Sequence, residues 1–128
     1  MKIEDYFSEI QAVVNSCPAV RLTNITFEKR GTYEGFIRGE LFFVDNSILH
    51  FREFIDVEKT TERLMYAYQY VDHSKKLVFR YDDTGHHKGA GIPTYPHHKH
   101  EGSEENVMSS RAPKLREILE EIELHIQV

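Results

Sequence analysis

Apolar residues recur at helical spacing near both ends of the chain. From Ile3 to Asn15 they fall every three or four residues, which predicts an amphipathic helix. A second stretch from about Pro113 to Ile126 has the same spacing, and Pro113 suits a first helical turn. We therefore expect two helices, each burying one apolar stripe against the rest of the fold.

The chain between these helices has the pattern of strands. Runs rich in β-branched and aromatic residues predict five of them, at about 20–27, 36–44, 48–57, 64–71 and 77–82. Short turns such as Asp45-Asn46-Ser47 separate successive runs, which favours antiparallel neighbours. The order predicts an α+β fold: an antiparallel meander of about five strands, with the N-terminal and C-terminal helices packed on one face.

Alternation along each strand assigns the two faces of the predicted sheet. We expect Leu41, Phe51 and Phe79 to face the helices. The opposite face would then carry arginines, a histidine and aromatic rings, namely Arg38, Arg52, Arg80, His50, Phe36, Phe42 and Phe54. Such interleaving could track single-stranded RNA, but a solvated face or a surface covered by a protein partner fits equally well. For strand 64–71 the pattern leaves open whether its three tyrosines face the helices.

Glu53 interrupts the apolar side of its strand. A carboxylate in that position is costly unless it is paired. It could face the histidine-rich segment or pair with an arginine. The alternative is that it lies close enough to the strand end to reach water.

Length and composition limit the choice further. The 128 residues, 40% of them apolar, fit a single domain covering 1–128 with one core. One cysteine excludes an internal disulfide, and we expect a reducing, cytoplasmic environment. No apolar run approaches the roughly 20 residues of a membrane span, so no membrane association is expected. The net charge of −5 requires that any nucleic-acid binding come from a local basic patch.

The densest candidate chemistry lies in a long segment at about 83–109, which has little periodicity and reads as a loop. Five of the eight histidines fall between residues 86 and 100: His86, His87, His97, His98 and His100. Histidine titrates near neutral pH, acts as a general acid or base, and ligates metals. Loops of this length inside a compact domain are usually functional or disordered. We therefore expect the functional site here.

One function for this loop is metal-independent cleavage of RNA. Two imidazoles can remove the proton from a 2′-hydroxyl and protonate the leaving oxygen. Arg80 and Lys99 are the nearest cations for the charged phosphorane, Asp82 could orient an imidazole, and Tyr81 could donate a hydrogen bond or stack on a base. Arg38, Arg52 and His50 would add substrate contacts.

Two other uses of the loop stay open. A divalent metal such as zinc could bind His98 and His100, which share one side of an extended segment, together with His86 or His87 and Asp82. The spacing matches no standard zinc module. The loop could also be part of a non-enzymatic interaction module. We predict catalysis without a metal.

An ordered set of motifs resembles one protein family. It comprises residues 39–53 (GELFFVDNSILHFRE), Tyr68-Gln69-Tyr70, Phe79-Arg80-Tyr81-Asp82, His86-His87 and residues 96–100 (PHHKH). This set, spanning about residues 35–101, resembles the TumE toxins of bacterial and archaeal type II toxin–antitoxin pairs. The resemblance implies a small toxin with ribonuclease-like activity, and an antitoxin partner, typically of helix-turn-helix type, encoded beside it. A homodimer is a further expectation, because a meander leaves edges that need protection.

Overall fold

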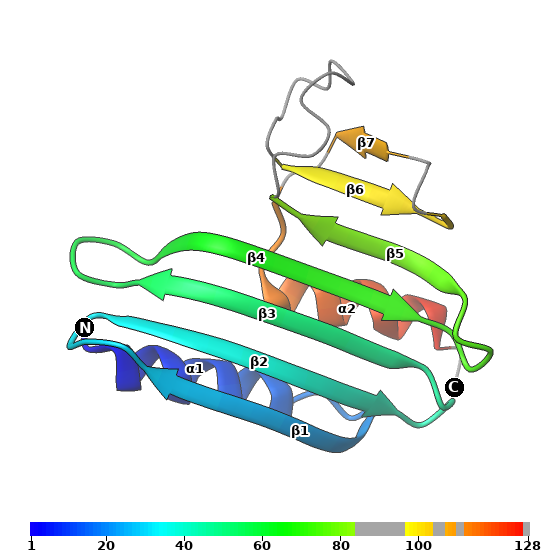
Figure 1. Ribbon diagram of the computed structural model, residues 1–128. Helices are drawn as coiled ribbons and strands as arrows, with labels where there is room; N and C mark the ends of the chain where they lie inside the picture. Colours follow the sequence, from blue (N-terminus) through cyan, green and yellow to red (C-terminus); the bar gives the residue numbers. More distant parts are fainter. Residues whose placement is uncertain (84–96, 104–106, 110–111, 127–128) are drawn as a thin grey trace.

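The computed structural model describes residues 1–83, 97–103, 107–109 and 112–126. Its elements are α1 (Ile3–Asn15), β1 (Val20–Lys29), β2 (Glu34–Phe43), β3 (Ile48–Asp56), β4 (Glu62–Val71), β5 (Leu77–Asp82), β6 (His98–Glu101), β7 (Val107–Ser109) and α2 (Leu115–His125). The seven strands form one sheet in sequence order, and every neighbouring pair is antiparallel. Both helices lie against one face of it (Figure 1). The predicted α+β meander with both helices on one face is confirmed.

Two strands lie where the sequence predicted only a loop. β6 pairs with β5, and β7 pairs with β6, so the sheet has seven strands among the described residues instead of five. The two strands have four and three residues, which is too short for a period-2 pattern to stand out. β6 also consists of His-Lys-His-Glu, with no apolar residue to mark the alternation. Its histidines therefore belong to the sheet.

The core lies between the sheet and the two helices. Ile10 and Val14 of α1 and Ile118 and Ile122 of α2 are buried, as the helical spacing predicted. Tyr66, Tyr68 and Tyr70 of β4 are buried in the same cluster, which answers the question that alternation left open. Each large apolar side chain buried there contributes about 1.5–3 kcal/mol to the free energy of folding. None of the described helices is long and apolar enough to cross a membrane.

Glu53 is part of this core and does not reach water. Its exposed fraction is 1%. The Tyr6 hydroxyl of α1 donates a hydrogen bond of 2.5 Å to Oε1, and the Tyr68 hydroxyl of β4 donates one to Oε2. Burial raises the pKa of Glu53, although the two hydrogen bonds and the charge of Arg63 act in the opposite direction. The alternative that Glu53 reaches water at the strand end is wrong, and its carboxyl group links α1 to the sheet.

Candidate functional site

The strand register collects polar side chains in two rows across the face of the sheet opposite the helices, which we call the open face. Residues directly opposite each other in antiparallel strands point to the same side. One row contains Thr26, Arg38, Arg52, Ala67, Asp82 and His98, in order from β1 to β6. The adjacent row contains Asn24, Glu40, His50, Gln69, Arg80 and His100. Seven of the predicted site residues thus share this face: Arg38, His50, Arg52, Arg80, Asp82, His98 and His100.

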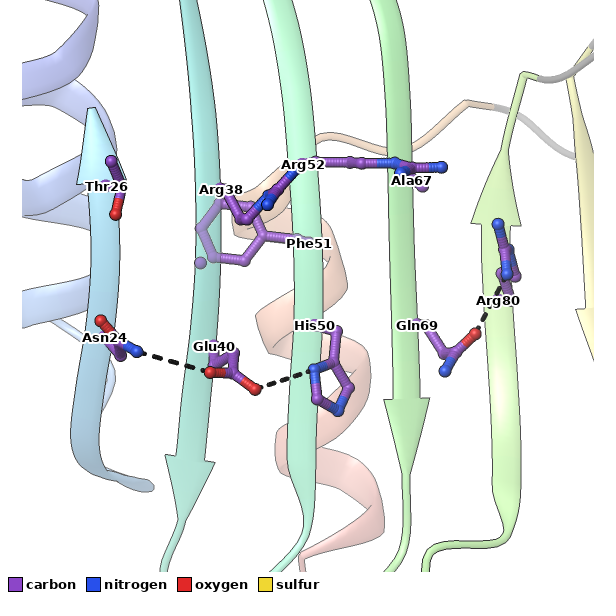
Figure 2. A pocket seen from close by; sticks show the side chains of 11 residues that line it. Asn24, Thr26, Arg38, Glu40, His50, Phe51, Arg52, Ala67, Gln69 and Arg80 are labelled. Carbon is purple, nitrogen blue, oxygen red and sulfur yellow. Dashed lines mark hydrogen bonds and ion pairs between the residues drawn. The ribbon is translucent and has the colours of Figure 1, made fainter. Parts of the chain in front are cut away.

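A hollow of about 370 Å³ lies over the central strands, lined by residues of both rows (Figure 2). Hydrogen bonds and ion pairs link the lining. Nδ1 of His50 lies 3.2 Å from Oε2 of Glu40, and Nη1 of Arg80 donates to Oε1 of Gln69 at 3.1 Å. These contacts form two separate groups, one that joins β2 to β3 and one that joins β4 to β5.

Arg38 and Arg52 are the exposed cations of this hollow. They lie directly opposite each other on β2 and β3. Within the described part of the chain, neither forms an ion pair with an acidic residue. Like charges at directly opposite positions destabilise a sheet. A bound anion such as a phosphate would relieve that repulsion.

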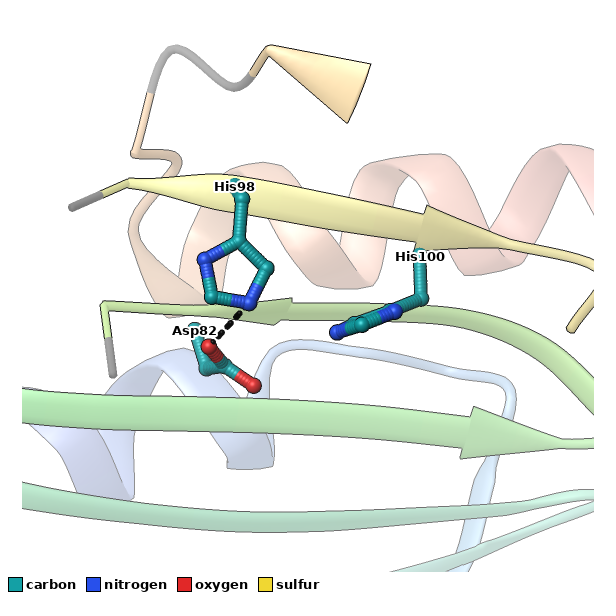
Figure 3. A group of neighbouring side chains, drawn as sticks. All are labelled: Asp82, His98 and His100. Atoms are coloured by element: carbon teal, nitrogen blue, oxygen red, sulfur yellow. Dashed lines mark ion pairs between the residues drawn. The ribbon is translucent and has the colours of Figure 1, made fainter. Parts of the chain in front are cut away.

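At the other end of the rows, Asp82 contacts both Arg80 and His98. Figure 3 shows Asp82 beside His98 and His100. Its Oδ2 accepts a hydrogen bond from Nε of Arg80 at 2.7 Å, and its Oδ1 lies 2.6 Å from Nε2 of His98. The ring of His100 lies 5.0 Å from that of His98, centroid to centroid, at 83°. Asp82, His98 and His100 are each at most 2% exposed. The result is a buried Arg–Asp–His chain with a second imidazole beside it.

This cluster suits two kinds of chemistry. A carboxylate held against an imidazole nitrogen fixes the orientation of the ring, as general acid–base catalysis requires. Asp82, His98 and His100 also offer ligand atoms that all lie within 4.8 Å of one another, as a divalent metal such as zinc requires. The Arg80 guanidinium on the same carboxylate works against a dication, because like charges repel strongly where water is excluded.

Because side chains alternate along β5 and β6, the predicted site residues Tyr81 and Lys99 lie on the face of the sheet that the helices cover. The Tyr81 hydroxyl donates a 2.6 Å hydrogen bond to Oε1 of Glu121 in α2, and burial together with this bond raises the pKa of Tyr81 to about 12. Nζ of Lys99 lies 2.7 Å from Oε2 of Glu101 and 3.3 Å from Oε2 of Glu121. Neither residue joins Arg80 and Asp82 on the open face.

His97 also lies apart from the histidine pair. Its Nδ1 is 2.7 Å from the Tyr66 hydroxyl, and the two rings stack at 5.7 Å. Tyr66 belongs to the helix-facing core. His86 and His87 lie outside the described residues, so the expected metal site with His86 has no described counterpart. Of the three clustered histidines that the structure describes, it brings two together, His98 and His100.

The predicted site left out four polar residues of the hollow: Asn24, Thr26, Glu40 and Gln69. Each lies on the same face as the arginines of its neighbouring strands. Gln69 was missed because the alternation in β4 was left unassigned. Once the tyrosines of β4 are placed towards the helices, the period of two puts Gln69 on the open face.

A family model described as toxin TumE matches residues 10–126 of the chain. No curated protein sequence and no solved structure matches.

Proposed function

Because the chain belongs to the TumE toxin family, we propose that it cleaves RNA on the open face of its sheet by histidine acid–base chemistry, without a metal. The family implies a toxin of a toxin–antitoxin pair and hence a cognate antitoxin. The observation that carries the proposal is Asp82 joined to both Arg80 and His98, with His100 beside them. This arrangement supplies an oriented imidazole, a second imidazole and a cation.

The reaction is an internal transfer of the phosphoryl group. A base takes the proton of the 2′-hydroxyl, and the 2′-oxygen forms a bond to phosphorus. The bond from phosphorus to the 5′-oxygen of the next nucleotide breaks, and an acid gives that oxygen a proton. The products are a 2′,3′-cyclic phosphate and a free 5′-hydroxyl, so neither a metal nor an outside nucleophile is needed. Proton transfers of this kind contribute about 10²–10⁴-fold each to the rate.

In this proposal His98 and His100 are the acid and the base, and Asp82 orients His98. Their rings lie 5.0 Å apart, which allows both to reach one phosphate. Arg80 stabilises the charge on the phosphorane, because its guanidinium lies in the same cluster and is partly exposed. Both imidazoles are almost fully buried, so the proposal requires that they become accessible when RNA binds.

His50 has a different role. It lies in β3, three strands from His100 in β6, which corresponds to about 14 Å at the usual spacing of strands. That separation is too large for His50 and His100 to act on one phosphate. We assign His50, with Arg38 and Arg52, to binding the RNA backbone along the hollow. These residues supply the local basic patch that a chain of net charge −5 needs.

The metal site is a second candidate, favoured by the compact set of ligand atoms from Asp82, His98 and His100. A zinc ion there would be held by three protein ligands, and chelation would then remove the activity. For the cellular setting, we propose a cytoplasmic toxin that a helix-turn-helix antitoxin neutralises. Expression should arrest growth, and the product of the neighbouring gene should relieve the arrest.

Cleavage of a labelled RNA by the purified protein, with and without EDTA, tests the proposal. We expect activity that survives EDTA and leaves 2′,3′-cyclic phosphate ends, and that is lost in a His98→Ala/His100→Ala variant. Activity that EDTA abolishes and zinc restores would show that Asp82, His98 and His100 bind a metal instead. Absence of cleavage, in a preparation that arrests growth on expression, would reject ribonuclease chemistry.

A further inference from the structure

The open face carries a pair of aromatic rings next to its exposed arginines. We propose that Phe36 and Phe54 form a stacking subsite for unpaired nucleobases, which restricts the toxin to single-stranded RNA. This inference rests on the proposed function and adds a determinant of substrate choice to the same face.

The register places the two rings together. Phe36 of β2 lies directly opposite Phe54 of β3, and the next open-face pair along the same strands is Arg38 opposite Arg52. Both rings are partly exposed. They alternate with the buried Ile37 and Glu53 and therefore belong to the open face, and the helices cover the opposite face of the sheet (Figure 1). Hence an aromatic pair directly adjoins a cationic pair on the same surface.

Arginines already lie close to one of these rings. Cζ of Arg38 is 5.7 Å from the centre of the Phe36 ring, and Cζ of Arg30 is 6.0 Å from it. A guanidinium beside an aromatic ring can stack on one side of a base and contact the adjoining phosphate. The site thus offers what a single nucleotide presents, namely a flat base and a negative charge.

The subsite favours unpaired RNA for a physical reason. In a duplex each base is stacked and paired inside the helix, so its flat surface cannot reach an aromatic side chain on a sheet. From Phe54 in β3 to His98 in β6 the distance is about 16 Å, from three strand spacings and two residues along the strand. A base stacked on Phe54 therefore lies outside the cleaved linkage, and its role is to position the RNA.

Phe42 provides a matched control. It lies on the same face of β2 and is also partly exposed. Its neighbours across the strands are Leu22 and Ile48 instead of arginines. Among the described residues no arginine or lysine lies over its ring. Replacing Phe42 should disturb the sheet about as much as replacing Phe36, but it should leave the binding of RNA unchanged.

The test uses a single-stranded 2′-O-methyl RNA, which lacks the nucleophile and stays intact, with an internal 2-aminopurine and a dye at one end. Quenching of 2-aminopurine reports stacking, and anisotropy of the dye reports binding. We expect Phe36→Leu/Phe54→Leu, which keeps apolar bulk but removes the rings, to lose the quenching and to bind at least about 5-fold more weakly. Phe42→Leu should match the wild type in both.

Three results would overturn the inference in different ways. Quenching and affinity unchanged in the double variant, with wild-type binding intact, would reject the stacking subsite and leave the proposed ribonuclease standing. No binding of the RNA by the wild type would reject the proposed function together with the subsite. Equal binding of a hairpin duplex and the single strand would show that unpaired bases are not selected.

Discussion

Tyr6 offers a sharp test of the buried carboxylate that links α1 to the sheet. Its hydroxyl donates a 2.5 Å hydrogen bond to Glu53, whose side chain is 1% exposed. Tyr6→Phe removes this donor and leaves a buried carboxylate oxygen with one partner fewer. Losing a buried hydrogen bond to a charged group costs about 1.5–3 kcal/mol. In a domain of 128 residues that corresponds to a fall in Tm of about 5 to 12 °C.

Tyr70→Phe is the matched control. Tyr70 is also buried, and its hydroxyl donates a 2.8 Å hydrogen bond to the neutral Ser47 hydroxyl. Loss of a neutral hydrogen bond costs about 1 kcal/mol, or about 4 °C. Differential scanning calorimetry near neutral pH measures both variants. A Tm for Tyr6→Phe equal to or above that of Tyr70→Phe would refute the idea that the Tyr6–Glu53 hydrogen bond anchors α1 to the sheet.

Three other substitutions test neighbouring parts of the account. Gly39→Ala should lower the free energy of unfolding by about 1–3 kcal/mol, measured by urea denaturation, because the new Cβ would lie 2.4 Å from a ring carbon of Phe51. An unchanged urea concentration at the midpoint of unfolding would contradict this. Asp82→Asn keeps the shape of the side chain but removes the charge beside His98, so the rate of RNA cleavage should fall about 10²–10⁴-fold; wild-type rates would exclude an orienting role. Burial raises the pKa of Glu53 above its ordinary 4.5 in the folded state, so its contribution to stability is fully present below 4.5 and is lost as the pH rises through the folded pKa. Unfolding curves should therefore show that the free energy of unfolding of Glu53→Gln rises relative to that of the wild type from pH 4.5 upwards. A difference between the two free energies that does not change with pH would show that Glu53 keeps its ordinary pKa.

The sequence predicts the fold well where apolar residues repeat with a clear period. Both helices and β1 to β5 lie close to the expected ranges, because each is long enough for its alternation or helical spacing to show. The polar open face follows from the same alternation, which placed Arg38, Arg52 and Arg80 on it. Register supplied what alternation lacked, since it brought Arg80 next to His100 and Asp82 next to His98.

The candidate site was harder to predict than the fold. A cluster of histidines in sequence does not stay together in space when part of it forms a strand. In β6, His98 and His100 face one side and Lys99 faces the other, so neighbours in sequence join different environments. Recognising four polar residues as a strand requires knowledge of their pairing with β5, which local sequence does not contain. The buried place of Glu53 likewise depends on tyrosines from two other elements.

His97 and His98 are adjacent in sequence but belong to opposite sides of the sheet, which makes their comparison the most direct test. The measurement is the rate of RNA cleavage in EDTA by His97→Ala and His98→Ala beside the wild type. We predict that His98→Ala loses at least about 100-fold in rate while His97→Ala keeps a rate close to that of the wild type. Equal losses in both, or a larger loss in His97→Ala, would contradict the assignment of the site to the open face.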